Sequence, residues 1–323
     1  MTLRKLFKAC MLASAVAAGT CAGAQTFPSK PIRILVGYPA GGTSDLQIRA
    51  IQEPLQRFLG QPVLVENKVG ASGAIATAQV ARAAPDGYTL LLPTNIFVIG
   101  PNLIKNVGFD PLKEFAPISL TSISPMVLVT HSSVPAGSVR EFIDYARKHP
   151  GTLEFGSAGA SSFGRMATEL FARRAGIEML HVPYQGAAQT TQAIAQGDIK
   201  VLISTLTAPL VSFEKEGKVR FLGAATEVSS PLLPGVPLIA DVLPGFKTEV
   251  WSGIVAPVGT PANVIARLQD AIAKSLALPE VRERYATIGL TPHSSSPKEF
   301  SDRLRTEYAE WGTVIREANI KAD

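Results

Sequence analysis

The first residues suited to binding chemistry lie in a loop near the amino-terminal end, residues 38–45, here called the first loop. An apolar run at residues 34–36 precedes it, two glycines interrupt it, and three small polar residues that can begin a helix close it. Glycine lets the backbone approach a ligand, and a helix start offers unpaired N–H groups and the positive end of its dipole. The sequence therefore predicts an anion site here, and its predicted contacts are Tyr38, Gly42, Thr43, Ser44 and Asp45.

A second loop of similar composition, residues 157–162, lies near the middle of the chain. It follows a strand pattern at residues 153–156 and opens a helical pattern at residues 163–175. Because the order of strand, small loop and helix start repeats, we expect both loops to hold the same ligand. Arg165, in the first helical turn, either faces solvent or reaches the ligand and selects a second acidic group. The predicted contacts of the second loop are Ser157, Ala158, Gly159 and Ser161.

The polar residues of the first loop also suit a purely structural role. Thr43, Ser44 and Asp45 are of types that commonly cap helices, and capping can coexist with ligand contact. The Asp45 carboxylate repels an acidic ligand, so it braces the loop, receives the amine of an amino-acid ligand, or offers only its backbone N–H group. Since the loops need close backbone approach, a bulky residue at Gly42 or Gly159 is expected to abolish binding while the fold survives.

Further candidates follow other predicted strands, at the sheet edge where open α/β proteins bind ligands. A glycine-rich segment at residues 70–73 follows one strand pattern, and it reads equally well as an ordinary turn. Tyr184 is either a cleft wall or a core aromatic. The further predicted contacts are Ala71, Ser72, Gly73, Thr94, Asn95, Tyr184 and Thr205.

Catalytic and metal chemistry has little support in the sequence. The first loop lacks both the third glycine of a dinucleotide fingerprint and the Lys-Ser/Thr of a phosphate loop. The histidines show no metal spacing, so we expect no metal and no cofactor. The alternative function is an exported α/β hydrolase or transferase with Ser44 or Ser157 as nucleophile, which requires a base within hydrogen-bond reach that the nearby sequence does not offer. The four histidines are His131, His149, His181 and His293.

The elements that position these loops alternate between short β-branched runs and longer Ala-rich helical patterns. This alternation is typical of an α/β protein with largely parallel sheets, and two such units, each with a small-residue loop, predict two lobes facing one cleft. The predicted strands are residues 32–37, 63–66, 88–92, 126–130, 153–156, 180–182, 201–204 and 251–256. The predicted helices are residues 44–59, 75–83, 138–148, 163–175, 262–278 and 297–315.

Residues 1–24 have the pattern of a secretory signal peptide, which predicts a periplasmic protein. Basic residues precede a short apolar stretch at residues 9–18, and Ala22-Gly23-Ala24 fits the cleavage rule, so the mature chain is expected to begin at Gln25. A membrane anchor is the competing interpretation, but the stretch falls short of the roughly 20 residues that span a bilayer. A lipid anchor on Cys21 is the third, although Thr20 stands where a lipoprotein signal normally has Gly or Ala.

Charge and composition narrow the class of protein further. The chain has 31 Lys and Arg, 26 Asp and Glu and a formal net charge of +5, and cleavage removes three of the basic residues. The remaining ones alternate with acids along helical stretches, so we expect no nucleic-acid partner. Cleavage also removes both cysteines, which leaves no disulfide. An apolar content of 46% supports a sizeable core.

Six sequence blocks, in order along the mature chain, carry a family resemblance. They read YPAGGTSD at residues 38–45, VENKVGASG at 65–73, APDGYTL at 84–90, GSAG at 156–159, HVPYQG at 181–186 and WSGIVAP at 251–257. Together they closely resemble the Bug family, the periplasmic solute receptors of tripartite tricarboxylate transporters. Where many relatives have a histidine followed by Leu-Ala after the second loop, this chain has Arg165-Met166-Ala167, so the ligand does not follow from the resemblance.

The resemblance implies a two-lobed periplasmic binding protein fold of type II, with two crossover strands and a ligand cleft between the lobes. Lobe 1 would comprise residues 25–124 and 251–323, and lobe 2 residues 125–250. The ligand would be a small carboxylate, such as a dicarboxylate, an aromatic acid or an amino acid, held by main-chain amides, small hydroxyls and ordered water. The implied partners are the membrane subunits of the cognate transporter, and we expect the receptor itself to be a monomer.

Overall fold

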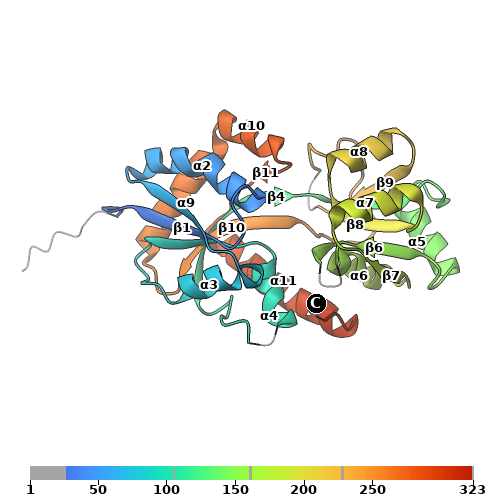
Figure 1. Cartoon of the computed structure of the whole chain (residues 1–323), viewed down its shortest axis with the longest axis horizontal. Helices are drawn as coiled ribbons and strands as arrows, with labels where there is room; N and C mark the ends of the chain where they lie inside the picture. Colours follow the sequence, from blue (N-terminus) through green and yellow to red (C-terminus); the bar gives the residue numbers. More distant parts are fainter. Residues whose placement is uncertain (1–26, 105, 160–161, 227–228, 322–323) are drawn as a thin grey trace, which may run out of the picture.

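The computed structural model describes residues 27–104, 106–159, 162–226 and 229–321. Two helix-covered sheets form two lobes, joined by a pair of extended segments (Figure 1). The predicted signal peptide, its cleavage before Gln25, the alternative anchor on Cys21 and the predicted contact Ser161 all lie outside the described residues. No helix in the described part of the chain combines the length and the apolar character needed to cross a bilayer.

Lobe 1 contains the six-stranded sheet, in the order β11-β4-β10-β3-β1-β2. β1 pairs in parallel with β2 and β3, whereas β10 runs antiparallel to β3 and β4. The strands are β1 (Ile32–Val36), β2 (Val63–Asn67), β3 (Thr89–Leu92), β4 (Phe115–Ser124), β10 (Val250–Pro257) and β11 (Thr291–Pro292). The helices are α2 (Thr43–Leu59), the short η1 (Ala71–Gly73), α3 (Ala74–Ala81), α4 (Ile96–Leu103), α9 (Ala262–Ala277), α10 (Pro279–Thr287) and α11 (Pro297–Glu317).

Lobe 2 contains the five-stranded sheet, in the order β7-β6-β8-β5-β9. β6 pairs in parallel with β7 and β8, and β5 runs antiparallel to β8 and β9. The strands are β5 (Met126–His131), β6 (Glu154–Ser157), β7 (Leu180–Pro183), β8 (Val201–Thr205) and β9 (Val219–Ala224). The helices are α5 (Val139–Lys148), α6 (Phe163–Ala175), α7 (Ala187–Gln196), α8 (Ala208–Lys215) and the short η2 (Ile239–Asp241).

The chain crosses between the lobes twice. β4 leads into β5 with only Pro125 between them, and the chain returns at the start of β10. β4 and β10 lie side by side, in an antiparallel register from Val250↔Ser124 to Pro257↔Phe115. The α/β two-lobed fold is therefore confirmed. Both sheets are mixed rather than largely parallel, because the strands next to each crossing run against the parallel strands of their own sheet.

The local sequence accounts for the helices that begin directly after the two loops. α2 starts after Gly42, whose backbone is extended, and buries Ile48, Ile51 and Leu55. α6 starts after Ser162, whose hydroxyl accepts a hydrogen bond from the Arg165 N–H group. Each loop therefore continues into a helix that is anchored by its own apolar face or cap.

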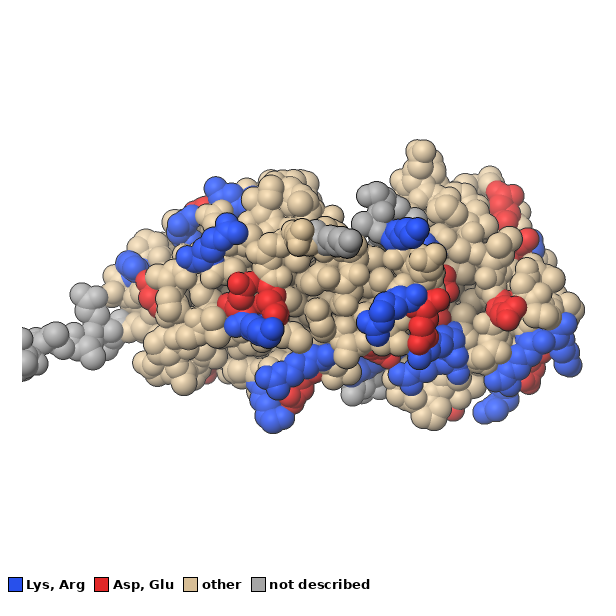
Figure 2. Space-filling view, turned by 90° about the horizontal axis from the view of Figure 1, so that it is seen from below, with Lys and Arg blue, Asp and Glu red and all other residues tan. Residues whose placement is uncertain are grey.

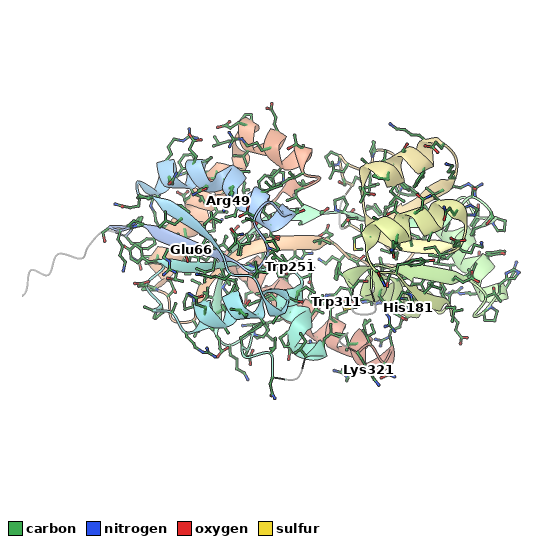
Figure 3. All side chains as sticks on the ribbon, viewed as in Figure 1. Arg49, Glu66, His181, Trp251, Trp311 and Lys321 are labelled. Carbon is green, nitrogen blue, oxygen red and sulfur yellow. The ribbon has the colours of Figure 1, made fainter. Side chains whose placement is uncertain are left out.

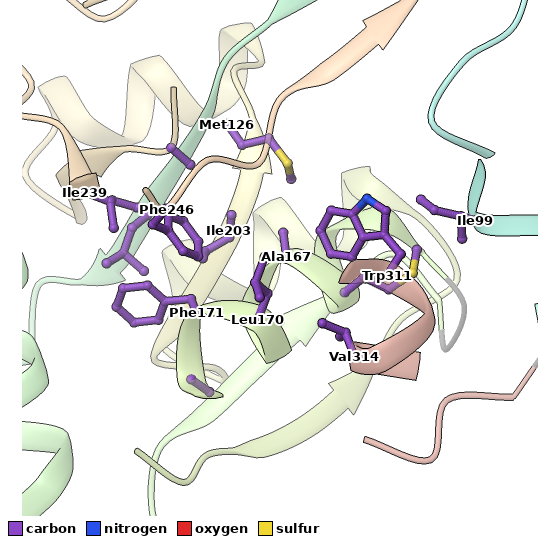
Figure 4. Close-up of a cluster of buried hydrophobic side chains, with 14 of the residues drawn as sticks. Ile99, Met126, Ala167, Leu170, Phe171, Ile203, Ile239, Phe246, Trp311 and Val314 are labelled. Carbon is purple, nitrogen blue, oxygen red and sulfur yellow. The ribbon is translucent and has the colours of Figure 1, made fainter. Parts of the chain in front are cut away.

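A hydrophobic cluster runs across both lobes and holds α11 against lobe 2 (Figure 4). In this cluster Trp311 and Val314 of α11 lie near Leu170 of α6. The rings of Phe163 and Trp311 meet edge to face, 5.1 Å between centroids. α11 thus packs on the lobe 1 sheet and on a lobe 2 helix at once. On the face seen in Figure 2, basic and acidic side chains are interspersed rather than gathered by sign.

Candidate functional site

Three strand ends of lobe 1 come together at the edge that faces lobe 2 (Figure 1). Gly37 follows β1 and lies so close to Gly73 that a Cβ atom on Gly37 would lie 2.5 Å from the Gly73 Cα atom. The hydroxyl of Tyr38 lies 2.8 Å from Oγ1 of Thr94, which follows β3. The first loop, the 70–73 turn and Thr94 therefore form one continuous surface, as expected for the carboxyl edge of parallel strands.

Asp45 is the brace of this surface. Its side chain is 3% exposed, and its carboxylate accepts hydrogen bonds from the Gly41 N–H group (2.9 Å), Arg49 Nε (2.9 Å) and Asn67 Nδ2 (3.0 Å). Burial by itself raises the pKa of Asp45, but these three donors outweigh it and hold the pKa below its usual value. The Asp45 N–H group bonds to the carbonyl of Gly42. Both polar groups of Asp45 are thus engaged within lobe 1.

The open donors of the first loop are main-chain groups. Within the described residues, the N–H groups of Thr43 and Ser44 have no hydrogen-bond partner. They stand at the start of a helix of 17 residues, where the helix dipole favours an anion. Thr43 is exposed and Ser44 is half-buried, so both donors lie at the surface of the lobe. This helix start has the chemistry of a carboxylate site.

The 70–73 turn forms a strained wall beside Tyr38. All four of its residues have positive φ angles, including 46° at Ala71 and 54° at Ser72. A left-handed conformation costs a residue with a Cβ atom about 1–2 kcal/mol, so contacts must hold the turn in place. The close approach of Gly37 and a hydrogen bond of 2.9 Å from Thr77 Oγ1 to the Gly73 carbonyl provide them. Ala71 and Ser72 themselves are exposed.

Two buried side-chain amides, one after β3 and one in α2, connect this part of lobe 1 to the crossing strands. Asn95, a predicted contact, is 3% exposed and bonds to the backbone on both sides of the first residue of β10. Its Nδ2 donates to the Glu249 carbonyl (3.0 Å), and its Oδ1 accepts from the Trp251 N–H group (2.9 Å). Gln47 of α2 was not predicted. It is 1% exposed and joins Ser252 of β10 to Ser122 of β4, with 2.8 Å for each hydrogen bond. The sequence feature that could have indicated Gln47 is its position four residues before Ile51, which places a polar amide on the apolar face of α2.

The second loop is held by a chain of two short hydrogen bonds. Ser157 is 1% exposed, and its hydroxyl donates to the Gly159 carbonyl at 2.7 Å. The same oxygen lies 2.7 Å from Nε2 of His181, which belongs to the neighbouring strand β7. Gly159 has a φ of 136°, a conformation that favours glycine. Ala158 is exposed and Gly159 is half-buried, so this part of the second loop is open to a ligand.

His181 supplies the base near Ser157 that the sequence did not reveal. The register of β6 and β7 pairs Phe155 with His181, which brings the imidazole to the strand end. Burial and, after it, the positive charge of Arg165 lower the pKa of His181 to about 4, so the ring is neutral at neutral pH. The single proton of the Ser157 hydroxyl goes to Gly159, so Nε2 of His181 must be the donor. A serine nucleophile needs the opposite arrangement, in which the hydroxyl donates its proton to the imidazole nitrogen.

The remaining lobe 2 candidates lie around this strand end. The Tyr184 N–H group bonds to the Ser157 carbonyl at 2.9 Å, and Thr205 ends β8 opposite Met126. The Arg165 side chain is only 15% exposed, and its Nε lies 3.6 Å from the Glu169 carboxylate. Arg165 is therefore embedded in lobe 2 rather than extended into solvent, close enough to His181 to affect its pKa.

Comparison with known proteins identifies the family. The model of the tripartite tricarboxylate transporter family receptor matches residues 47–320. Protein BugT of Bordetella pertussis is 32% identical over 301 residues, which cover 92% of each chain. The chain belongs to this receptor family. Its members are solute-binding receptors and not enzymes, which removes the hydrolase or transferase alternative for Ser44 and Ser157.

Solved structures of similar receptors fall into two groups by likeness. A solute-binding protein of this family from Polaromonas, without ligand, has a TM-score of 0.84 at 26% identity, over 90% of this receptor and 100% of that chain. The R. palustris protein Rpa4515 with adipate has a TM-score of 0.68 at 31% identity, over 91% and 99%. MatC from Rhodopseudomonas palustris with bound malate has a TM-score of 0.65 at 29% identity, over 90% and 100%.

Proposed function

We propose that this receptor works in the periplasm, captures a small carboxylate between its lobes and delivers it to the membrane subunits of a tripartite tricarboxylate-type transporter. The observation that carries the proposal is the start of α2, where the N–H groups of Thr43 and Ser44 are open and the helix dipole favours an anion. A signal peptide at residues 1–24 would direct the chain to that compartment. Membership in a transporter receptor family supports the delivery step.

The lobes proposed for capture are residues 25–124 with 251–323, and residues 125–250. The two sheets support this division, since each contains strands from one of these segments only. The side chains of Asp45, Asn95 and Ser157 would act indirectly, because their polar groups are engaged inside their own lobes. The proposed direct contacts are Tyr38, Gly42, Thr43, Ser44, Ala71, Ser72, Gly73 and Thr94 in lobe 1, and Ala158, Gly159, Ser161, Arg165, Tyr184 and Thr205 in lobe 2.

Closure of the two lobes is part of the proposal. The likeness is greater to the ligand-free Polaromonas protein than to the adipate and malate complexes, although the sequence identity is lower. A different angle between lobes of the same fold lowers the TM-score in this way. This supports an open arrangement that would close around a ligand by bending at the β4–β5 and β10 crossings.

A dicarboxylate is the ligand class that the site chemistry favours among those considered. Asp45 is the only acid in the first loop, and three donors already surround its carboxylate, which argues against recognition of an amine there. Arg165 adds a positive charge beside the second loop, suited to a second acidic group. Two structural neighbours bind adipate and malate, both dicarboxylates.

Thr43 offers a direct test of the main-chain site. Thr43 is the first residue of α2 and follows an extended Gly42, so proline fits there and removes the N–H group together with the hydroxyl. We expect Thr43→Pro to weaken adipate and malate binding about tenfold in calorimetry, the equivalent of one hydrogen bond to a charged group, with Tm unchanged. Thr43→Ala keeps the N–H group and serves as the matched control. Equal affinity in both variants, or conversion of either acid to product, would overturn the proposal.

A further inference from the structure

We propose that His181 is a positioning residue that presets the Gly159 carbonyl of the second loop for the carboxylate, acting through the Ser157 hydroxyl. This inference rests on the proposed function and assigns a part in it to a side chain outside the predicted contacts. His181 lies in lobe 2, across the molecule from Arg49, which bonds to Asp45 in lobe 1 (Figure 3). It belongs to β7, the edge strand of its sheet, and not to the loop that it controls.

The imidazole is fixed by its surroundings before any ligand arrives. Its ring packs on Phe155, with 5.0 Å between centroids, and the β6–β7 register sets the two residues opposite each other. Nε2 then reaches the Ser157 oxygen at 2.7 Å, and that hydroxyl reaches the Gly159 carbonyl at 2.7 Å. The rigid sheet therefore controls the loop through two hydrogen bonds in series.

Proton counting gives this relay one direction. The Ser157 hydroxyl has a single proton, which it donates to the Gly159 carbonyl. Its oxygen can then only accept from His181, so Nε2 carries the proton of the neutral ring. Without that donor, Ser157 would keep a buried oxygen with an unfilled accepting position, at an exposed fraction of 1%.

The relay matters to an acidic ligand because it controls a carbonyl oxygen. A carbonyl that points at the ligand would repel a carboxylate, whereas one held by a buried hydroxyl is directed into the lobe. Gly159, at a φ of 136°, has the backbone freedom to take several orientations, and its carbonyl accepts a hydrogen bond of 3.2 Å from the Ser162 N–H group and a shorter one, of 2.7 Å, from the Ser157 hydroxyl. His181 selects among these orientations through Ser157. Its contribution is preorganisation, since the loop need not be ordered when the ligand binds.

Four variants test this role by calorimetry with adipate and malate. His181→Phe keeps a ring against Phe155 and removes the donor, and we expect about tenfold weaker binding. His181→Gln keeps a side-chain N–H donor of similar reach and should stay within about threefold of the wild type. Ser157→Ala should lose about as much affinity as His181→Phe. The double variant Ser157→Ala/His181→Phe should lose no more than either, because the two residues act in series through the same hydrogen bonds. His149→Phe, at the exposed end of α5, is the control and should bind normally.

A ligand-free measurement separates this inference from the proposed function. The Ser162 N–H group bonds to the Gly159 carbonyl and the Tyr184 N–H group to the Ser157 carbonyl. Hydrogen exchange of these two amides, followed by NMR without ligand, should be about tenfold faster in His181→Phe and near wild type in His181→Gln. Unchanged exchange, or equal losses of affinity in the Phe and Gln variants, would overturn the positioning role. If the wild type binds neither acid while exchange responds as expected, the ligand proposal fails and the relay stands.

Discussion

The first loop, in lobe 1, and the second loop, in lobe 2, are held by different physical means. The first loop is held by charges: the Asp45 carboxylate bonds to Arg49, Asn67 and the Gly41 N–H group. The second loop is held by a neutral relay from His181 through Ser157 to the Gly159 carbonyl. Neither arrangement places an unpaired negative charge beside the helix start. Both therefore keep the main-chain donors available to an anion.

The loops also differ in what lies behind them. In lobe 1, Gln47 and Asn95 connect the binding surface to both crossing strands through buried amides. In lobe 2, the second loop is tied to β7, at the edge of its own sheet. Under the proposed function, a ligand at the first loop would therefore act on the crossing strands, whereas the second loop would respond within its own sheet.

The largest effect on stability and binding is expected at Gly37, where its backbone contacts that of Gly73 in lobe 1. A Cβ atom in Gly37→Ala would lie 2.5 Å from the Gly73 Cα atom, so the first loop and the 70–73 turn must move apart. We expect a loss of about 2–3 kcal/mol in unfolding free energy and about 100-fold in adipate affinity, measured by urea unfolding and calorimetry.

Gly137→Ala is the matched control, because a Cβ atom there meets only an ordinary contact of 3.5 Å with Glu141. It should change neither quantity by more than about 0.5 kcal/mol. If Gly37→Ala bound adipate as well as Gly137→Ala, the three strand ends of lobe 1 would not act as one surface.

A smaller effect is expected when the brace of the first loop loses its charge. Asp45→Asn keeps the shape but weakens the hydrogen bonds from Arg49 and Gly41, so we expect a loss of about 2 kcal/mol in unfolding free energy and weaker binding of malate. Glu66→Gln is the control: Glu66 also bonds to an arginine, Arg33, at 2.7 Å, but its side chain is 30% exposed. It should cost less than about 1 kcal/mol and leave binding intact.

The alternative role of Asp45 as an amine receptor gives the opposite pattern. Asp45→Asn would then leave stability unchanged and selectively weaken an amino acid such as aspartate. Titration of Asp45→Asn and of the control Glu66→Gln with malate and with aspartate distinguishes the two roles. Equal stability of Asp45→Asn and wild type would remove the contrast between the charged and the neutral loop.

Most of the fold followed from sequence periodicity, because strands and helices with a clear apolar pattern form regardless of context. α6 was predicted with its observed ends, and β1 and β5 with ends within one residue. β4 was missed because hydroxyl residues such as Ser119 and Ser122 interrupt its apolar pattern; both are buried and hydrogen-bonded. β5 and β10 were predicted as strands, but their antiparallel direction was not, since strand direction depends on where the chain crosses between the lobes.

The candidate site was predictable as far as local composition reaches. Gly-rich loops at helix starts indicate where main-chain donors are open, and Thr43 and Ser44 follow from that rule. His181 could not be connected to Ser157, because 24 residues separate them and only the β6–β7 register brings them together. Asn95 looked like a loop contact, yet its amide completes the start of β10, 156 residues away from Asn95 along the chain.

The smallest effect expected concerns the neutral relay and appears as a pH dependence of stability. Burial and the charge of Arg165 lower the pKa of His181 to about 4, below the roughly 6.5 of an unfolded histidine. Between these values the unfolded chain binds the proton and the folded chain does not. The stabilisation is therefore complete above pH 6.5 and is lost as the pH falls toward 4. Allowing for solvent screening of a half-buried ring, we expect a loss of about 1 kcal/mol from pH 7 to pH 4.5.

Urea unfolding at the two pH values measures this loss, and His181→Gln isolates it. The variant keeps a donor to Ser157 but has no group that titrates in this range, so its unfolding free energy should fall by about 1 kcal/mol less than that of the wild type. Asp45 also has a lowered pKa, so its stabilisation is lost in the same direction, as the pH falls, but at lower pH, and it contributes equally to both proteins. If wild type and His181→Gln lost stability in parallel, His181 would bind its proton equally in the folded and unfolded chain. The folded state would then have no preference for the neutral ring, and the contrast between the charged and the neutral loop would be lost.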